Sequence, residues 1–352
     1  MSDMQPRLWM RHEVRPTERR APIVPDDARG LVARGVSVTV EESPQRVFPA
    51  ADYAAAGCRV VPAGSWVDAA RDHFVVGLKE LPDRPAALAH RHVYFGHAYK
   101  GQEGARDLLR RFASGGGELL DLEYLVDADW RRHAAFGYWA GYVGAALAVL
   151  RFRGRLDEPL RPLSKESLDA ALRESADGQA PPRAIVIGAL GRSGRGARAA
   201  LETAGIPPTC WDLAETRVLD RDALLDHDIL VNTVLTTRPV PPFLTGADVA
   251  NPARRLAVVS DVTCDVTSEC NVLSIYQRTT SWQRPVDRLH DAPPLEIIAI
   301  DNLPSLLPME ASVDFSAELT PHLATLGGSD PAWQRCARHF RDALDRLGDH
   351  VQ

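Results

Sequence analysis

Short apolar runs alternate with amphipathic, helix-like stretches over the first 100 residues of the chain. A helix beginning at Pro25-Asp-Asp ends near Gly35 and leads into the apolar run Val36-Ser-Val-Thr-Val40. Similar runs at Phe74-Val-Val-Gly77 and Val93-Tyr-Phe95 have the length and composition of buried strands. Because strands that alternate with helices usually pair in one direction, this pattern predicts an α/β domain with a parallel sheet.

A second series of apolar runs begins at Arg183 and predicts a second sheet of the same kind. Between the two series, residues 151 to 182 are charged, carry four prolines and have little strand character, so they are predicted to form a surface excursion. The predicted strands of the second sheet are Arg183-Ala-Ile-Val-Ile-Gly188, Thr209-Cys-Trp-Asp212, Asp228-Ile-Leu-Val-Asn232, Leu256-Ala-Val-Val-Ser260 and Leu295-Glu-Ile-Ile-Ala-Ile300. The predicted fold class is therefore α/β, with two doubly wound domains.

One uncharged stretch, residues 134 to 150, could be mistaken for a membrane segment. It is shorter than the roughly 20 residues that cross a bilayer, and alanine and glycine, which contribute little transfer free energy, dominate it. We therefore predict a buried helix and no membrane partner. Its Gly137, Gly141 and Gly144 would present a smooth face for close packing between domains.

Length, charge and cysteine content narrow the function classes. A chain of 352 residues suits about two domains, and its 41 basic against 47 acidic side chains give a net charge of −6. Because no long basic block interrupts this balance, small molecules rather than nucleic acid are the expected partners. The charged segment from Met1 to Glu13 lacks the apolar stretch of a signal peptide. Five scattered cysteines without a C-x-x-C pair predict a reducing, cytoplasmic setting and no metal site.

A glycine-rich turn follows the first strand of the second series. Gly188, Gly191 and Gly194 lie between that strand and an alanine-rich helix, where glycines let a pyrophosphate approach the helix amides. Asp212, 24 residues after Gly188, ends the next strand, close to the roughly 20 expected for a carboxylate that binds a ribose 2′-hydroxyl. An acid there repels a 2′-phosphate, so the pattern favours NAD. The nearby Arg217 keeps NADP open, and a glycine turn without any nucleotide is the structural alternative.

The lysines point to a second group of candidate residues. Only three of the 41 basic side chains are lysine, namely Lys79, Lys100 and Lys165. A guanidinium stays protonated in proteins, whereas a buried ammonium can lose its proton and act as a base. Lys79 and Lys100 lie in neighbouring strand-end segments, so these segments are the first candidates for chemistry. Arginine enrichment through base composition, with accidental lysines, is the alternative.

Short motifs along most of the chain carry a resemblance to a known family. Residues 7 to 315 resemble the NAD-dependent, lysine-forming saccharopine dehydrogenases and, more distantly, alanine dehydrogenase and the nucleotide-binding part of transhydrogenase. The motifs are Arg11-His-Glu13 with Glu18-Arg-Arg20, Glu42-Ser-Pro-Gln45, Pro62-Ala-Gly-Ser-Trp66, Gly77-Leu-Lys-Glu80, His97-Ala-Tyr-Lys100, Asp121-Leu-Glu-Tyr-Leu125, Arg131-Arg132 with Ala134-Ala-Phe-Gly137, Ile187-Gly-Ala-Leu-Gly-Arg192 and Ile300-Asp-Asn-Leu-Pro-Ser-Leu-Leu-Pro308.

The resemblance implies a domain arrangement and a reaction. Two Rossmann-like domains would flank a cleft, with residues 1–135 and 305–352 as the substrate and catalytic domain and residues 136–304 as the NAD-binding domain. NAD would oxidise the secondary amine of saccharopine to an imine, and hydrolysis would release lysine and 2-oxoglutarate. The resemblance assigns Lys79 as the base and His97 as the acid and base that moves protons during hydrolysis, a task that suits a histidine.

The resemblance also implies binding residues. Arg20 and Arg131 would bind substrate carboxylates, with Arg132 as an alternative to Arg131, while Lys100, Glu80 and Glu123 would adjust the charge around the substrate. The implied cofactor-binding residues are Gly188, Gly191, Arg192, Gly194, Asp212 and Asp301. A solvated surface charge is the alternative for Lys100, Glu80 and Glu123, and chance placement is the alternative for Arg20 and Arg131, since the chain has 38 arginines. Asp301 could instead cap a helix that begins near Leu303.

Some positions depart from the family pattern. Asn302 stands where the fungal pattern has a histidine, and residues 282 to 294 are divergent. Loops on the substrate side decide which amine and which 2-oxo acid are accepted. A related opine-type or alanine-dehydrogenase-like oxidoreductase, or a non-catalytic NAD-binding protein, therefore remains an alternative.

Overall fold

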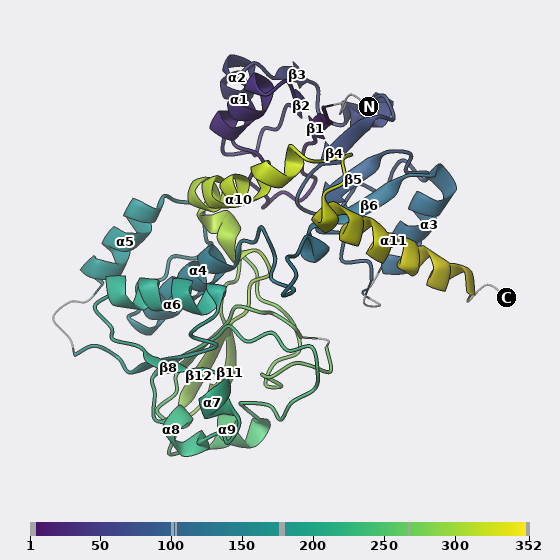
Figure 1. Cartoon of the computed structure of the whole chain (residues 1–352). Coiled ribbons are helices and arrows are strands. Elements are labelled where there is room, and N and C mark those ends of the chain that lie inside the picture. The colour runs from purple at the N-terminus through teal and green to yellow at the C-terminus, as the bar shows by residue number, and fades with distance from the viewer. Residues whose placement is uncertain (1–4, 100–101, 103, 176–179, 267, 350–352) are drawn as a thin grey trace. The chain divides into compact units, whose positions relative to one another are not determined.

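The chain forms two compact units. The computed structural model describes residues 5–99, 102, 104–175, 180–266 and 268–349, and Figure 1 shows their helices and strands. Unit 1 comprises Met1–Ala135 and Ala311–Gln352, and unit 2 comprises Phe136–Glu310. Both ends of the sequence thus belong to unit 1.

Unit 1 is built on a six-stranded sheet in which all neighbouring strands are parallel. The strand order is β3-β2-β1-β4-β5-β6, the order of doubly wound dinucleotide-binding folds. The chain reverses its winding between β1 and β4, and ligands of such sheets bind beyond the carboxyl ends of the strands at that point. The strands are β1 (Arg7–Met10), β2 (Ser37–Glu41), β3 (Arg59–Val61), β4 (His73–Val76), β5 (Arg91–Tyr94) and β6 (Glu118–Asp121).

Helices from both ends of the sequence complete the core of unit 1. The helix α11 lies beside β6 and α3, as the yellow and blue ribbons of Figure 1 show. Phe112 of α3 meets Phe340 of α11 edge to face, and both pack with Leu119 in one buried cluster. The helices are α1 (Pro25–Ala33), α2 (Ala50–Ala55), η1 (Ser65–Asp68), α3 (Ala105–Gly115), η2 (Leu122–Tyr124), α10 (Pro308–Leu323) and α11 (Pro331–Asp349).

Unit 2 carries the second six-stranded sheet, in the order β11-β12-β10-β9-β7-β8. Its strands are parallel except for the edge strand β11, which is antiparallel to β12. The winding reverses between β7 and β9, which makes their carboxyl ends the expected ligand position of this unit. The strands are β7 (Ala184–Ile187), β8 (Thr209–Trp211), β9 (Ile229–Asn232), β10 (Val258–Asp261), β11 (Asp287–Asp291) and β12 (Pro294–Ile298). The predicted α/β fold class with two doubly wound sheets is confirmed.

The strand β11 and the helix α5 are among the elements of unit 2 that were not predicted. The strand β11 lies in the divergent stretch, where charged and half-exposed residues hide its character. The helix α5 lies in the predicted surface excursion, where the Ser164 side chain caps it by accepting from the Ser167 amide. The helices are α4 (Gly137–Phe152), α5 (Lys165–Glu174), α6 (Arg192–Thr203), α7 (Leu213–Thr216), α8 (Arg221–Leu225), α9 (Gly246–Ala250) and η3 (Leu303–Leu306).

The apolar stretch predicted as a buried helix is α4, and its glycines do serve close packing. A Cβ on Gly141 would lie 1.8 Å from the Ser193 carbonyl oxygen of α6, and one on Gly144 would lie 2.7 Å from Val262. These contacts lie inside unit 2, so the expectation that the glycines pack between domains was wrong. Among the described residues, no helix combines the length and apolar character required to cross a membrane.

Candidate active site

The backbone of Lys79 is held at the switch point of the unit 1 sheet. The Glu13 carboxylate, just beyond β1, accepts hydrogen bonds from the amides of Leu78 and Lys79 at 2.7 and 3.0 Å. The Arg11 guanidinium donates to the Lys79 carbonyl. A Cβ on Gly77 would lie 2.5 Å from Arg11 Nε, so glycine is required for the guanidinium to pass. The backbone of Lys79 is thus fixed from two sides.

Arg11 and Glu13 form a buried ion pair behind the lysine. Their side chains are 0% and 5% exposed, and Arg11 Nη1 lies 3.3 Å from Glu13 Oε2. Burial raises the pKa of Glu13, while Arg11 and the two amides act against this shift. Removing one member of this buried pair would leave the other charge uncompensated, so both members are needed. Together they hold the backbone of Lys79 through its amide and its carbonyl group.

Two carboxylates lie close to the half-buried Lys79 side chain. Burial alone would raise the pKa of Glu18, but Arg20 and, more weakly, the Lys79 ammonium lower it below its ordinary value. The same holds for Glu80, where Arg15 provides most of the opposing effect and Lys79 adds to it. Lys79 therefore has two acids nearby whose charges favour its ammonium form. Neither Glu18 nor the Arg11 and Glu13 pair was given a role from the sequence, although each follows β1 at the switch point.

The predicted substrate-binding residues Arg20 and Glu80 both form ion pairs in the structure. Arg20 is 4% exposed and binds Glu18 through Nε at 2.8 Å and Nη2 at 2.5 Å. Glu80 is half exposed and accepts from Arg15 Nε and Nη2 at 2.9 and 3.0 Å. Each pair holds its side chain in one orientation.

His97 lies on the loop that follows β5, beside Glu123. Its Nδ1 is 3.5 Å from Glu123 Oε2, and its side chain is 55% exposed. The ring stacks on Phe95 with ring centroids 6.5 Å apart. The φ angle of His97 is 49°, in the left-handed region that costs a residue with a side chain roughly 1 to 2 kcal/mol. Such strain is retained mainly at functional sites.

Arg131 lies on a tight turn beyond η2. The Asp127 carboxylate accepts from the amides of Asp129 and Arg131, each at 2.9 Å, and the Arg131 and Arg132 side chains are exposed. Trp130 in this turn has a φ of 61°, so it shares the left-handed region with His97. The exposed position leaves the Arg131 guanidinium accessible to a carboxylate ligand.

The other two lysines, Lys100 and Lys165, give no second candidate base among the described residues. Lys100 lies outside the described residues. Lys165 belongs to unit 2, where it begins α5 and its ammonium donates to Asp169 of the same helix at 2.6 Å. Of the described lysines, Lys79 is therefore the one that lies at a switch point.

The predicted glycine turn lies at the switch point of unit 2. Gly188 follows β7 with a φ of 82°, and a Cβ on Gly194 would lie 2.1 Å from the Gly188 carbonyl oxygen. Gly191 is the N-cap residue of α6, whose first helical residue is Arg192. The close approach of turn and helix leaves the first amides of α6 at the carboxyl edge of the sheet, a geometry that suits the pyrophosphate of NAD.

Asp212 connects the end of β8 to this turn. Its Oδ2 accepts from the Leu190 amide at 2.9 Å and its Oδ1 accepts from the Leu213 amide at 2.9 Å. Two carboxylate oxygens offer about four acceptor positions, so capacity remains for ribose hydroxyls. The nearby Arg217 is exposed.

Asp301 lies in the turn after β12 and is exposed. The residue at the N-cap position of η3 is Asn302, so the alternative in which Asp301 caps this helix was wrong. Burial raises the pKa of the Cys264 thiol, and the charges of Asp261 and Asp301 add to this shift. Asp301 therefore lies near the carboxyl ends of β10 and β12.

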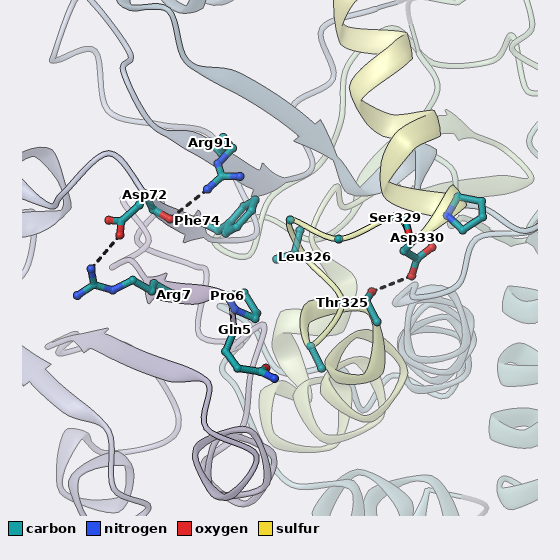
Figure 2. A pocket seen from close by; sticks show the side chains of 14 residues that line it. Gln5, Pro6, Arg7, Asp72, Phe74, Arg91, Thr325, Leu326, Ser329 and Asp330 are labelled. Atoms are coloured by element: carbon teal, nitrogen blue, oxygen red, sulfur yellow. Dashed lines mark hydrogen bonds and ion pairs between the residues drawn. The ribbon is translucent and has the colours of Figure 1, made fainter. Parts of the chain in front are cut away.

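A cavity of about 710 Å³ lies at the opposite, amino-terminal edge of the unit 1 sheet. Figure 2 shows Arg7, Asp72, Phe74 and Arg91 around it, next to the turn of residues 324–331. Arg7 binds Asp72 at 2.8 Å and Arg91 stacks 3.7 Å above the Phe74 ring. Because these residues lie where β1, β4 and β5 begin, the cavity is separate from Lys79 and His97, which follow the ends of β4 and β5.

The chain matches known proteins over most of its length. Residues 9–143 match the family model described as alanine dehydrogenase/PNT, N-terminal domain. The NAD-dependent, L-lysine-forming saccharopine dehydrogenase of Neurospora crassa is 42% identical, over 97% of this chain and 97% of that protein. The chain belongs to this saccharopine dehydrogenase family. The resemblance predicted from the short motifs is confirmed.

Two further relatives agree with this placement. The saccharopine dehydrogenase of Schizosaccharomyces pombe is 38% identical, over 97% of this chain and 99% of its own length. Among solved structures, an L-alanine dehydrogenase covers 98% of this chain with a TM-score of 0.71 at 16% identity, and the match spans 100% of that structure. At this identity the likeness shows a shared fold. This chain thus shares its fold with alanine dehydrogenase.

Proposed function

We propose that this protein oxidises saccharopine with NAD and releases lysine and 2-oxoglutarate, or catalyses the reverse condensation. The observation that carries the proposal is the 42% identity with a lysine-forming saccharopine dehydrogenase over 97% of both chains. The position of Lys79 at the switch point of one sheet and of the glycine turn at the switch point of the other supports it.

In this mechanism Lys79 Nζ takes the proton from the secondary amine of saccharopine. The carbon next to that nitrogen can release a hydride only when the amine is neutral, so proton removal precedes oxidation. Glu18 and Glu80 stabilise the ammonium that forms. The fixed backbone of Lys79 keeps the origin of its side chain at the carboxyl end of β4.

His97 exchanges protons during hydrolysis of the resulting imine. The Glu123 carboxylate faces Nδ1 and favours a proton there, so Nε2 is the ring nitrogen that serves the substrate. It takes a proton from the water that adds to the imine carbon and returns one to the nitrogen that leaves as lysine. Atoms balance as saccharopine, NAD and water on one side, and lysine, 2-oxoglutarate, NADH and a proton on the other.

Unit 2 holds the cofactor in this proposal. Gly188, Gly191 and Gly194 with Arg192 would bind the pyrophosphate, Asp212 the ribose, and Asp301 would lie toward the nicotinamide end. Bound NAD supplies the acceptor for the hydride that leaves the substrate carbon. Unit 1 then serves the substrate, with Arg20, Arg131 and Lys100 as partners for its carboxylates.

A reducing, cytoplasmic location fits this proposal. None of the five cysteines forms a disulfide, and Cys58 and Cys336 are buried. Burial raises the pKa of Cys58 to about 11, which keeps this thiol protonated and unreactive at neutral pH.

The proposal is tested by mixing the protein with NADH, 2-oxoglutarate and a panel of amines that includes lysine. We expect NADH oxidation with lysine, and a loss of about 10² to 10⁴ in rate for Lys79→Met or His97→Gln, because positioned acids and bases contribute this much. Turnover with ammonia and pyruvate instead would favour an alanine-dehydrogenase-like enzyme, and turnover with another amine would favour a related opine-type enzyme. No turnover with any amine would contradict the proposal.

A further inference from the structure

A buried carboxyl group that the proposed mechanism does not use lies next to the His97 and Glu123 pair. Asp121 ends β6 and is 0% exposed. Its Oδ1 accepts from the Glu123 amide at 2.9 Å. Its Oδ2 is buried without a hydrogen-bond partner among the described residues. A buried carboxylate oxygen that lacks a donor is unfavourable, so this group requires a physical explanation.

The loop that carries His97 passes directly over this carboxyl group. Gly96 precedes His97, and a Cβ on Gly96 would lie 3.4 Å from Asp121 Oδ2 and 2.6 Å from Leu119 Cδ2. The missing side chain therefore lets the loop approach β6. A weak hydrogen-bonding contact from the Gly96 amide lowers the pKa of Asp121, although its geometry is poorer than that of an ordinary hydrogen bond. Asp121 is thus linked to Glu123 through a cap and to His97 through the neighbouring glycine.

The charged groups that face Asp121 come from two elements. His97 follows β5, and Glu123 belongs to η2. The other titratable neighbours lie on β5, its following loop, η2 and α11, and burial raises the pKa of each, so they stay neutral: Tyr94, Tyr99, Tyr124 and Cys336. Among the described residues, His97 and Glu123 are therefore the groups whose charge acts on Asp121.

The protonation of these three groups is coupled. Burial raises the pKa of Asp121 from 3.8 to about 6, the Glu123 charge acts in the same direction, and His97 opposes it. Two carboxylates side by side are stable when the imidazole is a cation. When the imidazole is neutral, one carboxyl group gains by taking up a proton. Both arrangements carry the same net charge of about −1.

We propose that Asp121 is a positioning residue that acts through His97 and Glu123, ionised while His97 is a cation and protonated while His97 is neutral. It keeps the charge of the cluster constant as His97 gives and takes protons. This inference rests on the acid and base role proposed for His97.

The direct test is carbon-13 NMR of the whole protein with labelled aspartate carboxyl groups, from pH 4 to 8. We expect one aspartate to titrate with a midpoint near 6. Its midpoint should fall in Glu123→Gln, which removes a like charge, and rise in His97→Gln, which removes a cation. An aspartate that responds to both substitutions is identified without any change at position 121. If no aspartate responds to both, the inference is overturned, whether or not the enzyme turns over saccharopine.

The pH profile of saccharopine oxidation gives a second readout. In Asp121→Asn the carboxyl group with a pKa of about 6 is gone, so the limb of the profile near that pH should move. A purely structural role would lower the rate without moving this limb. Glu118→Gln is the matched control, because Glu118 begins the same strand, faces Arg91 and Arg341, and has a pKa raised by burial. An unmoved limb in Asp121→Asn, or an equal shift in the control, would overturn the inference.

Discussion

The position of the Lys79 backbone depends on Arg11 and Glu13, two residues that lie 66 or more positions away in the sequence. Both are buried, so their attraction is strong but each leaves a costly charge when the other is removed. The motif Arg11-His-Glu13 is part of the family resemblance, but the resemblance assigned no role to these residues. Their function is to hold a backbone segment, and no local sequence pattern reports such a contact.

Substitution of Glu13 tests this support. We expect Glu13→Gln to lower the free energy of unfolding by about 3 to 5 kcal/mol, because Arg11 is left buried without its partner. Urea denaturation of the two proteins measures the difference. Glu80→Gln is the control, since the Arg15 and Glu80 pair is partly exposed to solvent and exposed pairs contribute at most about 1 kcal/mol. Equal losses in both variants would contradict a special role for the buried pair.

A second prediction at the residue scale concerns how Asp121 changes the stability of the fold with pH. Its folded pKa of about 6 lies above the ordinary 3.8, so the folded state retains this proton as pH rises from 4 toward 6 while the unfolded state releases it. The stability that the group contributes is complete below about pH 4 and is lost as pH rises through 6. Relative to Asp121→Asn, the wild type should lose on the order of 3 kcal/mol between pH 4 and 7. A constant difference between the two proteins, measured by chemical denaturation, would contradict it.

Among the elements, those with a strong local signal could be predicted from the sequence. The strands β7 and β9 are continuous apolar runs, and the glycine turn between β7 and α6 is followed at the expected distance by Asp212. The strand β11 carries charges at an edge, and α5 depends on a serine cap within a proline-rich stretch, so both were missed. The prediction that the glycines of α4 pack between domains was wrong, because a sequence can show a smooth helix face but not the element that packs against it.

The glycine turn supplies a prediction at the element scale. In Gly194→Ala the new Cβ would meet the Gly188 carbonyl oxygen at 2.1 Å, so α6 must move away from the turn. We expect NADH affinity, followed by nicotinamide fluorescence, to fall by at least tenfold. Gly30→Ala in α1 is the matched control, because nothing lies within 4 Å of its Cβ, and an alanine there should leave NADH binding unchanged. Unaltered binding in Gly194→Ala would exclude this turn as the cofactor site.

For the whole molecule, two sheets of different strand order bring functional groups to their switch points. Unit 1 gathers Lys79, His97 and Glu123 at the carboxyl ends of β4, β5 and β6, and unit 2 gathers the glycine turn and Asp212 at the ends of β7 and β8. The motifs could be found in the sequence, but the contact of Cys336 with the Asp121 carbonyl joins residues 215 positions apart. Only the folded chain reveals such contacts, which is why Asp121 had no role in the sequence prediction.

The central claim is that the Lys79 ammonium gives up its proton and then takes one from the substrate amine. The most direct measurement is the initial rate of NAD reduction by saccharopine in the wild type and in Lys79→Met, with NADH affinity measured on the same samples. The account predicts a rate at least about 10²-fold lower in the variant and an unchanged NADH affinity. A variant that reduces NAD as fast as the wild type would contradict it.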